Sequence, residues 1–460
     1  MDETVEGKKV SSHWRQILFW LVVAAMMLLA GVILASWVVG MKLGAEIVKI
    51  SEAGEPLTFP DVARMQVRQH SDGEDAAHYY VEALASIGPA NLSNLKRIHS
   101  FYRQNMAALP ADQFPVDLRE SVSQNLTVAK AVFEKLDKAA SEPLARFDIG
   151  IRNGIKAAGT HMQGANTIVL LMSLRTMDLI LQGRDEDAAD SLVSLLKLMR
   201  IFDSHPTMVV YTIKAQFVGL ACEDVRLLLE RGSASAESLT KLEETLSAVV
   251  PADALEKVFL AERVNQIEIG RNLIPEKIAA EYLQNPAPDI PERIRLPGSF
   301  LGRLRLRQKA RRYFRDMDQL ITVSRRPWPQ PFVEIFDKMF KSTDKPGKLI
   351  ASAAAHTYLA AEVFVALHCT RIAVAIEGFL AGQGSGQLPE ALDELVPNYI
   401  TSVPLDVFTG KQLLYRHDEE SYMVYSTSIN RLDDGGSIRP KEGEKVPLDR
   451  GLQIRTNLTK

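Results

Sequence analysis

The stretch YSTSINRLDDGG, residues 425–436, places oxygen-bearing side chains and two glycines directly after a run of alternating polar and apolar residues. Asn430, Asp433 and Asp434 can supply side-chain oxygens, and calcium takes about six to eight oxygen ligands from carboxylates, carbonyls and water. Leu432 excludes an EF-hand loop, which needs oxygen ligands at alternate positions. Asp-Asp-Gly-Gly is also ordinary turn chemistry. The residues leave a calcium site and a structural turn as alternatives.

Local catalytic motifs are absent from the sequence, which has no H-E-x-x-H, G-x-S-x-G, P-loop or strand-linked G-x-G-x-x-G. His356 and His368 share a predicted helix but lie about 120° apart around its axis, so they cannot share a metal on one face. Arg175 and Asp178 stand in an apolar helical segment and are expected to be paired structural charges. The sequence therefore assigns no catalytic or cofactor-binding residue.

An uncharged run, QILFWLVVAAMMLLAGVILASWVVGM, covers residues 16–41. A helix crosses a bilayer with about 20 apolar residues, and Trp14, Trp20 and Trp37 lie near the ends of the run, as interfacial aromatic residues do. A cleaved signal peptide has a shorter apolar core of about 7 to 15 residues. We therefore expect one uncleaved transmembrane helix over residues 14–41, with cleavage as the alternative.

The orientation of this helix follows from the basic residues that flank it. Three precede the run and two follow it closely: Lys8, Lys9, Arg15, Lys42 and Lys49. The positive-inside rule then predicts a short cytoplasmic N-terminus, residues 1–13, with the bulk of the chain on the other side of the membrane. A cytoplasmic location for the bulk of the chain is the alternative.

Composition limits the classes of function. The 460 residues are 46% hydrophobic and carry a formal net charge of −3 with a pI of about 6.4. The chain is therefore a folded protein, and its charge argues against a general nucleic-acid binder. Cys222 and Cys369 stand in apolar helical segments, where buried inert thiols are expected and one disulfide is the alternative.

Residues 42–284 show apolar residues at helical spacing. Two related segments, LILQGRDEDAADSLVSLL and LLLERGSASAESLTKLEETL, each end an apolar helix at Gly183 or Gly232 and then restart. Leu192 and Leu239 are 47 residues apart, a period that suits a helical-repeat solenoid. Two copies are too few for a repeat family, so we expect an irregular antiparallel helical bundle, with a short solenoid as the alternative.

Residues 285–345 combine a proline-rich linker, NPAPDIPERIRLP, with a strongly basic segment. Between Arg293 and Arg326 eleven Lys or Arg residues oppose two Asp residues, a local charge of +9 (11 − 2). Apolar residues recur there at spacings of four and three: Leu306, Ala310, Tyr313, Met317 and Leu320. The pattern predicts an amphipathic helix whose basic part, Arg303–Arg315, contacts anionic lipid or an acidic partner. A merely solvated basic face is the alternative.

Residues 346–460 begin with a long apolar helix, roughly Gly347 to Leu380, and continue through LPEALDELVPNYI, VPLDVFTGKQLLYR and SYMVYSTS to the acidic glycine loop. This order resembles the soluble part of the type II secretion major pseudopilin. The resemblance implies a small α+β module with a short antiparallel sheet and a calcium loop at Asn430, Asp433 and Asp434. The chain also resembles uncharacterised bacterial membrane-anchored helical proteins, through GEPLTFPDVARM and DGEDAAHYY.

Departures from the pseudopilin pattern limit what the resemblance implies. The start of the apolar run, HWRQILFW, lacks the processing glycine and the following glutamate of pilin-like proteins, so no pilin-type processing or polymerisation is expected. Val407 follows Asp406 where proline is usual, and Ser428 stands where glycine is usual. Asp406 is expected to be structural, with its carboxylate accepting backbone N–H groups of a turn.

The sequence thus predicts a mainly α protein with one N-terminal transmembrane helix, a helical bundle and a pseudopilin-like C-terminal module. With the resemblance, this places the chain in the bacterial inner membrane as a single-pass protein whose bulk is extracytoplasmic. The expected function is non-catalytic binding or scaffolding, with an envelope protein as partner. An extracytoplasmic hydrolase or transferase without a local motif is the alternative.

Overall fold

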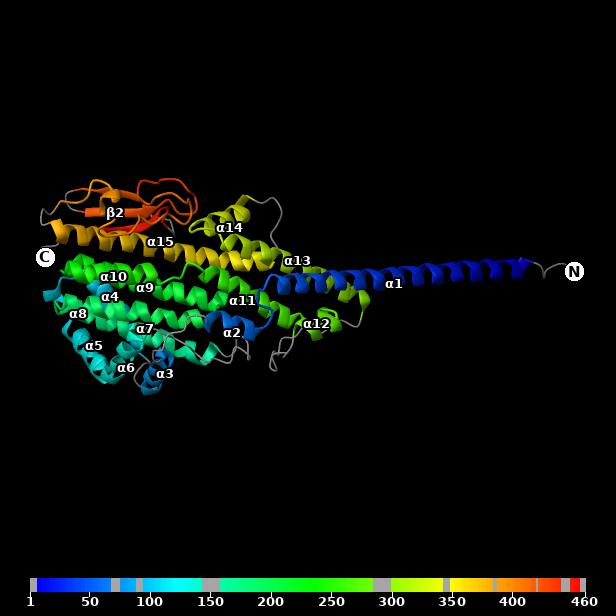
Figure 1. Cartoon of the computed structure of the whole chain (residues 1–460), viewed down its shortest axis with the longest axis horizontal. Coiled ribbons are helices and arrows are strands. Elements are labelled where there is room, and N and C mark those ends of the chain that lie inside the picture. Colours follow the sequence, from blue (N-terminus) through cyan, green and yellow to red (C-terminus); the bar gives the residue numbers. More distant parts are fainter. Residues whose placement is uncertain are drawn as a thin grey trace. The chain divides into compact units, whose positions relative to one another are not determined.

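A computed structural model describes residues 6–67, 75–87, 94–142, 158–283, 299–341, 348–383, 387–418, 421–439 and 447–455 (Figure 1). Within these residues it has fifteen α-helices and one three-stranded antiparallel sheet. The contacts divide the chain into two compact units. Unit 1 takes the described residues of Met1–Met65 and Leu260–Gln319, and unit 2 takes those of Gln66–Ile151, Ile155–Phe259 and Leu320–Lys460. The predicted mainly α class with a small C-terminal antiparallel sheet is confirmed.

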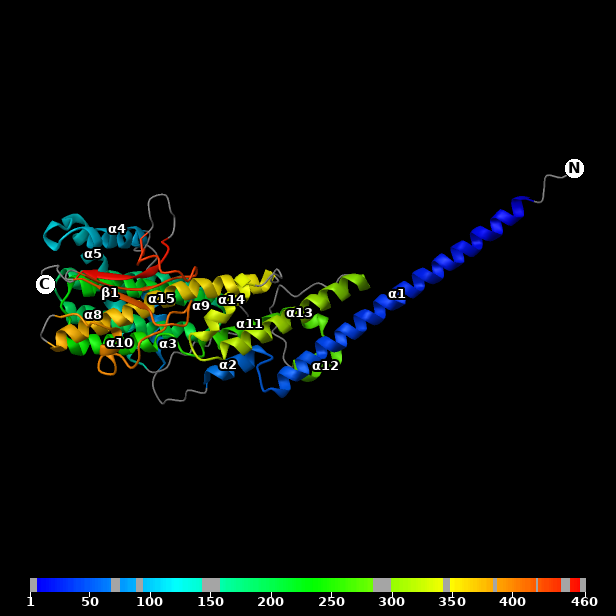
Figure 2. The same cartoon turned by 90° about the horizontal axis from the view of Figure 1, so that it is seen from above.

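Helix α1, Glu6–Glu52, is a single helix of 47 residues that contains the uncharged run. The chain leaves the helix at Gly54, which adopts a φ of +68° and whose N–H donates to the carbonyl of Ser51 at 2.9 Å. Figure 2 shows the N-terminal part of α1 extending well beyond the other helices of unit 1.

The C-terminal part of α1 is buried in the core of unit 1. This core includes Leu43, Ile47 and Ile50 of α1, which are 0–4% exposed. The other elements of the unit are α2 (Phe59–Val67), the end of α11 (Ala254–Ile269), the 3-10 helix η5 (Arg271–Leu273), α12 (Glu276–Tyr282) and most of α13 (Phe300–Ser324). They complete the core with Leu57, Ile267, Leu273, Ile274, Leu283 and Phe314.

A buried arginine joins three segments of unit 1. Arg263 of α11 is 1% exposed, and its guanidinium lies 2.7 Å from a carboxylate oxygen of Glu55 and 3.1 Å from one of Asp318. A buried cation is tolerated only when paired, and loss of one partner of such a pair typically costs about 3–5 kcal/mol. The chain just after α1 is therefore fastened to α11 and α13.

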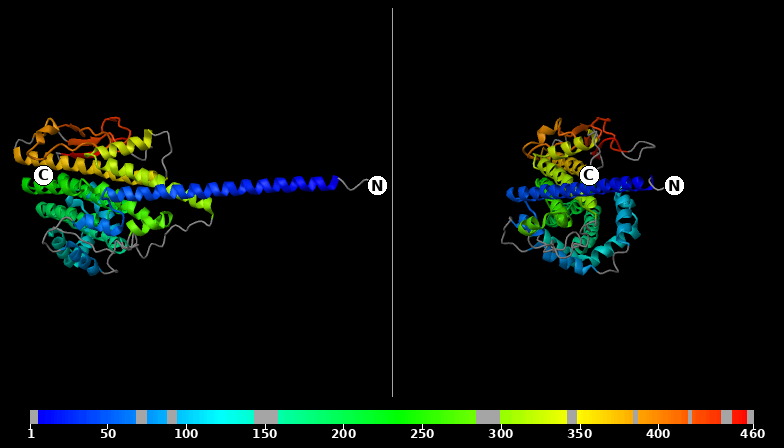
Figure 3. Two further views of the ribbon diagram at one scale, coloured as in Figure 1. Left: turned by 45° about the vertical axis from the view of Figure 1, so that its right-hand side comes forward. Right: turned by 90° about the vertical axis from the view of Figure 1, so that its right-hand side faces the viewer.

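Unit 2 is a helical bundle built from ten α-helices in the described residues. They are α3 (Ala76–Ser86), α4 (Leu95–Ala108), α5 (Val116–Val128), α6 (Lys130–Ser141), α7 (Ala158–Leu181), α8 (Asp185–Leu198), α9 (Met208–Arg231), α10 (Ala236–Ala248), α14 (Gln330–Lys341) and α15 (Lys348–Gln383). Short 3-10 helices are η2 (Ala111–Gln113), η4 (Met199–Ser204) and η6 (Leu392–Leu395). Figures 1 and 3 show α15 between the sheet on one side and α9 and α10 on the other, which agrees with its contacts.

The two related segments form the hairpins α7–α8 and α9–α10, which lie side by side. Asp185 accepts the backbone N–H of Ser233 at 2.8 Å, and Glu186 accepts that of Ser235 at 2.7 Å. Further along the same helices Lys241 donates to Asp190 at 2.6 Å. These partners are 48 to 51 residues apart. The turn of one hairpin is thus capped by acidic residues of the other, as in stacked hairpins.

The sheet is antiparallel with strand order β1-β2-β3, formed by Leu414–His417, Ser421–Ser426 and Arg450–Arg455. The pairing of β1 with β2 confirms the predicted strand pair. Strand β3 was not predicted, because RGLQIR is short and half polar. Tyr422 of β2 is buried, and its hydroxyl donates to Glu377 of α15 at 3.1 Å, so the sheet is held on this helix.

Candidate functional site

Among the described residues three helices are long and apolar enough to cross a membrane, and of these three only α1 carries its apolar surface on the outside. An 18-residue apolar window of α1 has no buried residue, whereas 67% of Gly164–Leu181 in α7 and 72% of the window in Ala355–Gly382 of α15 are buried. Trp14, Trp20 and Trp37 are all more than 60% exposed. The helices α7 and α15 form the interior of unit 2, and α1 presents a surface that suits a membrane.

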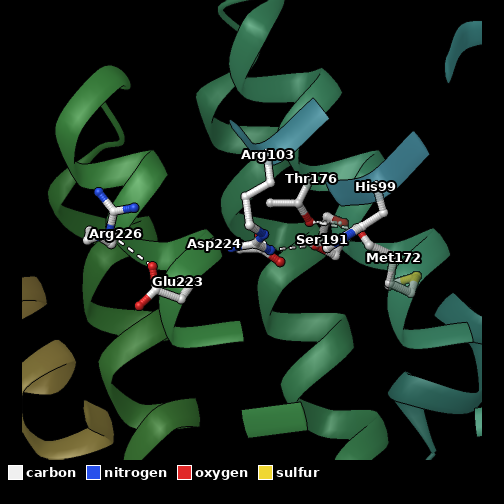
Figure 4. Close-up of polar contacts among 9 residues, drawn as sticks. His99, Arg103, Met172, Thr176, Ser191, Glu223, Asp224 and Arg226 are labelled. Carbon is white, nitrogen blue, oxygen red and sulfur yellow. Dashed lines mark hydrogen bonds and ion pairs between the residues drawn. The ribbon is translucent and has the colours of Figure 1, made fainter. Parts of the chain in front are cut away.

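A buried polar cluster joins α4, α7 and α9 inside unit 2 (Figure 4). Nε2 of His99 lies 2.8 Å from the hydroxyl of Ser173, and Nη2 of Arg103 donates to the same hydroxyl at 3.0 Å. Arg103 also forms an ion pair with Asp224, which is completely buried. The cluster thus holds two side chains of α4, His99 and Arg103, against α7 and α9, which follow much later in the sequence.

Burial controls the charges in this cluster. It lowers the pKa of His99 to about 4, and the nearby positive charge of Arg103 acts in the same direction. Burial raises the pKa of Asp224 to about 6, against the opposing effects of Arg103 and of hydrogen bonds from Ser173 and Arg103. His99 is therefore a neutral imidazole at neutral pH.

A serine within hydrogen-bond reach of a neutral histidine is the pattern of an activated nucleophile. Here the hydroxyl of Ser173 is already used by Arg103 as an acceptor, and the residue is 0% exposed. Neither of the two cavities described below is lined by Ser173 or His99. As folded, the cluster is enclosed between the helices and joins α4 to α7 and α9.

A cleft of about 300 Å³ opens elsewhere on unit 2. Its walls combine aromatic, proline and charged side chains: Tyr211, Val250, Pro251, Ala252, Asp253, Leu255, Glu256, Ser324, Arg325, Arg326, Pro327, Trp328 and Pro331. The rings of Tyr211 and Trp328 both pack against Phe364, with centroids 6.0 and 5.2 Å away. A smaller cavity shares Tyr211 and borders the ion pair between Lys214 and Asp203.

The two arginines that line this cleft form ion pairs, one with a lining residue and one with a residue of α14. Arg325 donates to Glu256 at 2.7 Å, and Arg326 pairs with Glu334. An apolar, aromatic floor with a few polar groups at the edge is the usual composition of a binding site. The lining of this cleft has that composition.

The residues predicted to bind calcium lie in the loop after β2. A carboxylate oxygen of Asp433 lies 3.0 Å from Arg416, and its other oxygen accepts the hydroxyl of Tyr425 at 3.1 Å and the N–H of Gly435 at 2.9 Å. The hydrogen bond from Gly435, aided by Tyr425 and Arg416, lowers the pKa of Asp433. Asp434 accepts the side-chain amide of Asn430 at 2.8 Å.

The loop backbone is arranged around another carboxylate, Asp449, which the sequence did not suggest. Asp449 is completely buried and accepts the N–H groups of Gly436 and Ser437, each at 2.9 Å. Ser428, which stands where the resembled loop has glycine, adopts the left-handed φ of 53° that glycine favours. The turn therefore forms with serine at this position.

The loop carries oxygen ligands of the kind that calcium binds, but the carboxylates of Asp433 and Asp434 contact other residues of the protein. In the part of the chain that the structure describes, no group of three or more His, Cys, Asp or Glu side chains is placed to hold a metal ion. Calcium binding at Asn430, Asp433 and Asp434 stays a prediction. To bind the ion through the oxygen that contacts Arg416, the carboxylate of Asp433 would have to release that arginine.

The remaining sequence-derived expectations concern structural residues. Asp406 is structural as predicted, because it accepts the N–H of Phe408 at 2.9 Å and the hydroxyl of Thr409 at 3.0 Å. Cys222 and Cys369 are both free and buried, which confirms the expectation of buried thiols. Arg175 and Asp178 do not pair with each other.

Their actual partners come from other helices. Arg175 binds Asp137 at 2.8 Å, and Asp178 accepts the hydroxyl of Tyr102 at 2.9 Å. Only the occurrence of polar residues in apolar helices, as in LLMSLRTMDLIL and LACEDVRLLL, signalled these networks in the sequence.

The buried state of His99 predicts a pH dependence of stability. Its pKa is about 4 in the folded chain against 6.5 in the unfolded chain, so the unfolded chain binds more protons between these values. The contribution of His99 to the free energy of unfolding is complete above about pH 6.5 and falls by on the order of 2 kcal/mol toward pH 4.5. We expect His99→Gln to lose less stability than the wild-type protein between pH 7 and pH 4.5.

Denaturant unfolding of the detergent-solubilised protein at both pH values measures this difference. Asp224 titrates in the opposite sense over a similar range, but it is present in both proteins. His78→Gln is the matched control, because the side chain of His78 is 69% exposed. Equal pH dependence in wild-type protein and His99→Gln would contradict the prediction.

Calcium binding at the C-terminal loop is tested by thermal melts in calcium and in chelator. A ligand that binds only the folded state raises the free energy of unfolding by about 2.7 kcal/mol at a hundredfold excess over its dissociation constant. The calcium hypothesis predicts a rise in melting temperature that Asp433→Ala, Asp434→Ala abolishes. Identical melts at millimolar calcium would leave the loop as a turn held by the pair of Arg416 and Asp433.

Comparison with known proteins gives no relative for this chain. No protein-family model matches it, and no curated protein or solved structure matches it. The pseudopilin resemblance therefore rests on the C-terminal segments themselves, and function has to be argued from the residues and their geometry.

Proposed function

We propose that this protein is a single-pass protein of the bacterial inner membrane that binds or scaffolds an envelope protein without catalysis. The observation that carries the proposal is the exposed apolar surface of α1, beside the burial of α7 and α15. In this proposal residues 1–13 are cytoplasmic and the helical and C-terminal parts are extracytoplasmic, as the flanking basic residues predict.

The non-catalytic part of the proposal is supported by the state of the buried polar groups. The hydroxyl of Ser173 and the imidazole of His99 form the one nucleophile-like contact discussed above, and both are enclosed. A general base must reach its proton in a plausible substrate pose. Ser173 is 0% exposed, and its hydroxyl already accepts a hydrogen bond from Arg103.

Two features support a binding role. The cleft around Tyr211 and Trp328 offers aromatic surface with a charged edge, which suits an exposed loop of a protein partner. The small sheet on α15, with the pseudopilin-like order of its segments, gives a second surface for docking to an envelope complex. Both surfaces belong to unit 2.

The alternative is an extracytoplasmic hydrolase or transferase, and the contact between Ser173 and His99 is the observation that favours it. Such an enzyme would need α4 to move away from α7 to admit a substrate. Turnover of an envelope substrate by the purified protein, lost in Ser173→Ala, would establish this alternative and overturn the proposed non-catalytic role.

The membrane anchor is tested by placing charge in the exposed apolar run. Leu28 and Leu29 are 73% and 51% exposed, and an arginine in the middle of a membrane helix costs about 2.5–3.5 kcal/mol. We expect Leu28→Arg, Leu29→Arg to be released from membranes by alkaline carbonate, while wild-type protein stays. The matched control replaces two exposed valines of α5 by arginine, Val116 and Val128, each 65% exposed.

Orientation is measured in the same strains with a reporter fused after Lys460 that is active only outside the cytoplasm. Release of the wild-type protein by carbonate would contradict the anchor. An inactive reporter on a protein that stays in the membrane would reverse the orientation and leave the anchor intact.

The binding role is tested by crosslinking in cells, with Trp328→Ala as the variant of the cleft. We expect Trp328→Ala to reduce crosslinking to envelope proteins several-fold, because aromatic residues in a pocket dominate binding energies. Phe101→Ala is the control, since Phe101 is an aromatic residue of α4 that is 52% exposed. Melting temperatures of both variants identify any loss by unfolding. Equal crosslinking by a folded Trp328→Ala would exclude the cleft as the docking site.

A further inference from the structure

Helix α13 is fastened to α1 by one arginine inside unit 1. Nη1 of Arg307 donates to the carbonyl of Ser36 at 2.9 Å and lies 3.2 Å from its hydroxyl, while Nε donates to the carbonyl of Leu273 at 3.0 Å. A Cβ added to Gly40 would lie 3.2 Å from this guanidinium. Glycine at this position leaves room for the arginine against α1. Ser36 and Gly40 belong to the uncharged run, so the contact lies on the apolar segment itself.

The two helices run in the same direction. Seven residues after the contact of Arg307 with Ser36, Phe314 shares the buried core with Leu43, so both helices advance together (Figure 2). The contacts of Arg307 give offsets of 271 (307 − 36) and 267 (307 − 40). These offsets place Phe300, the first residue of α13, level with residues 29–33 of α1. The start of α13 thus lies beside the exposed apolar run.

The exposed surface at the start of α13 is apolar and basic together. Phe300 and Leu301 are 42% and 47% exposed. Arg305 is exposed, and the guanidinium of Arg303 lies 5.8 Å from the ring of Phe300. The helix carries seven Lys or Arg residues against two Asp residues. Apolar tips beside arginines that can extend toward phosphate are typical of a helix at a membrane interface.

We propose that the first turns of α13 enter the membrane interface beside α1 and bind anionic phospholipid. Phe300 and Leu301 enter the acyl chains, and Arg303 and Arg305, further along α13, extend toward the lipid phosphates and bind them. The inference rests on the proposed membrane anchor, because the contact of Arg307 with Ser36 sets the depth of α13 relative to α1. Lipid is favoured over an acidic protein because the same short segment exposes large apolar side chains next to the basic ones.

The test measures depth in purified full-length protein in nanodiscs of phosphatidylcholine with phosphatidylglycerol. Single nitroxide labels are placed at Leu301→Cys, at Gln319→Cys and at Leu28→Cys, and the native thiols Cys222 and Cys369 are buried. Accessibility to oxygen, which concentrates in lipid, is compared with accessibility to a water-soluble nickel chelate. We expect position 301 to resemble position 28 and position 319 to be aqueous.

Charge dependence is tested with two variants that each remove two arginines from α13. Each arginine near an anionic surface favours the bound state by a factor of about five. We expect Arg303→Gln, Arg305→Gln to increase the nickel accessibility of position 301 several-fold. Arg312→Gln, Arg315→Gln is the matched control, because its residues lie further from the apolar run, where salt screens the charge within about 8 Å. In pure phosphatidylcholine the two variants should behave alike.

The outcomes separate this inference from the anchor. If position 301 is as accessible to nickel as position 319 while position 28 is in lipid, α1 spans the membrane and the proposal for α13 is overturned. If position 28 is itself aqueous, the anchor fails and the proposal fails with it. Equal responses of the two arginine variants in anionic nanodiscs would overturn lipid binding by Arg303 and Arg305.

Discussion

The structure depends on one constraint, which is that the two parts of helix α1 need different surroundings. The first part of α1 exposes its apolar side chains, and the last part buries Leu43, Ile47 and Ile50 in a protein core. Each large apolar side chain left in water forgoes about 1.5–3 kcal/mol. Over the uncharged run this sums to tens of kcal/mol, which exceeds the net stability of about 5–15 kcal/mol that a folded domain has. A bilayer around the exposed run would remove this conflict.

The sequence predicted the elements whose signals are local. The helix of the uncharged run, the basic helix and the long apolar helix follow from composition and periodicity, and the structure contains each of them. Strand β3 was not predicted, because its six residues gain their strand character only by pairing with β2. The second membrane-like helix, α15, shows the limit of composition, since its apolar surface is covered by protein.

The candidate sites were less accessible to prediction for the same reason. His99, Ser173 and Asp224 meet across 74 and more residues of chain, and their role depends on packing that no local pattern encodes. In the C-terminal loop the sequence identified Asn430, Asp433 and Asp434 as oxygen donors. It could not show that Arg416 pairs with Asp433, or that Asp449 accepts a backbone N–H group of the turn. The sequence identified which residues of the loop could donate oxygen atoms. Their hydrogen-bond partners could not be predicted, because Arg416 reaches the loop only when the sheet places β1 beside it.

Helix α15 has a further consequence for the order in which the chain is made. It packs against α9 and α10 on one side and supports the sheet through Glu377 on the other. Helix α10 ends at Ala248, but α15 starts only at Lys348, after the linker and α13 have been synthesised. Until then the faces of α9 and α10 that α15 covers lack this partner, although α8 already packs against both helices and α7 against α9. The growing chain therefore passes through a stage in which its bundle is open on one side.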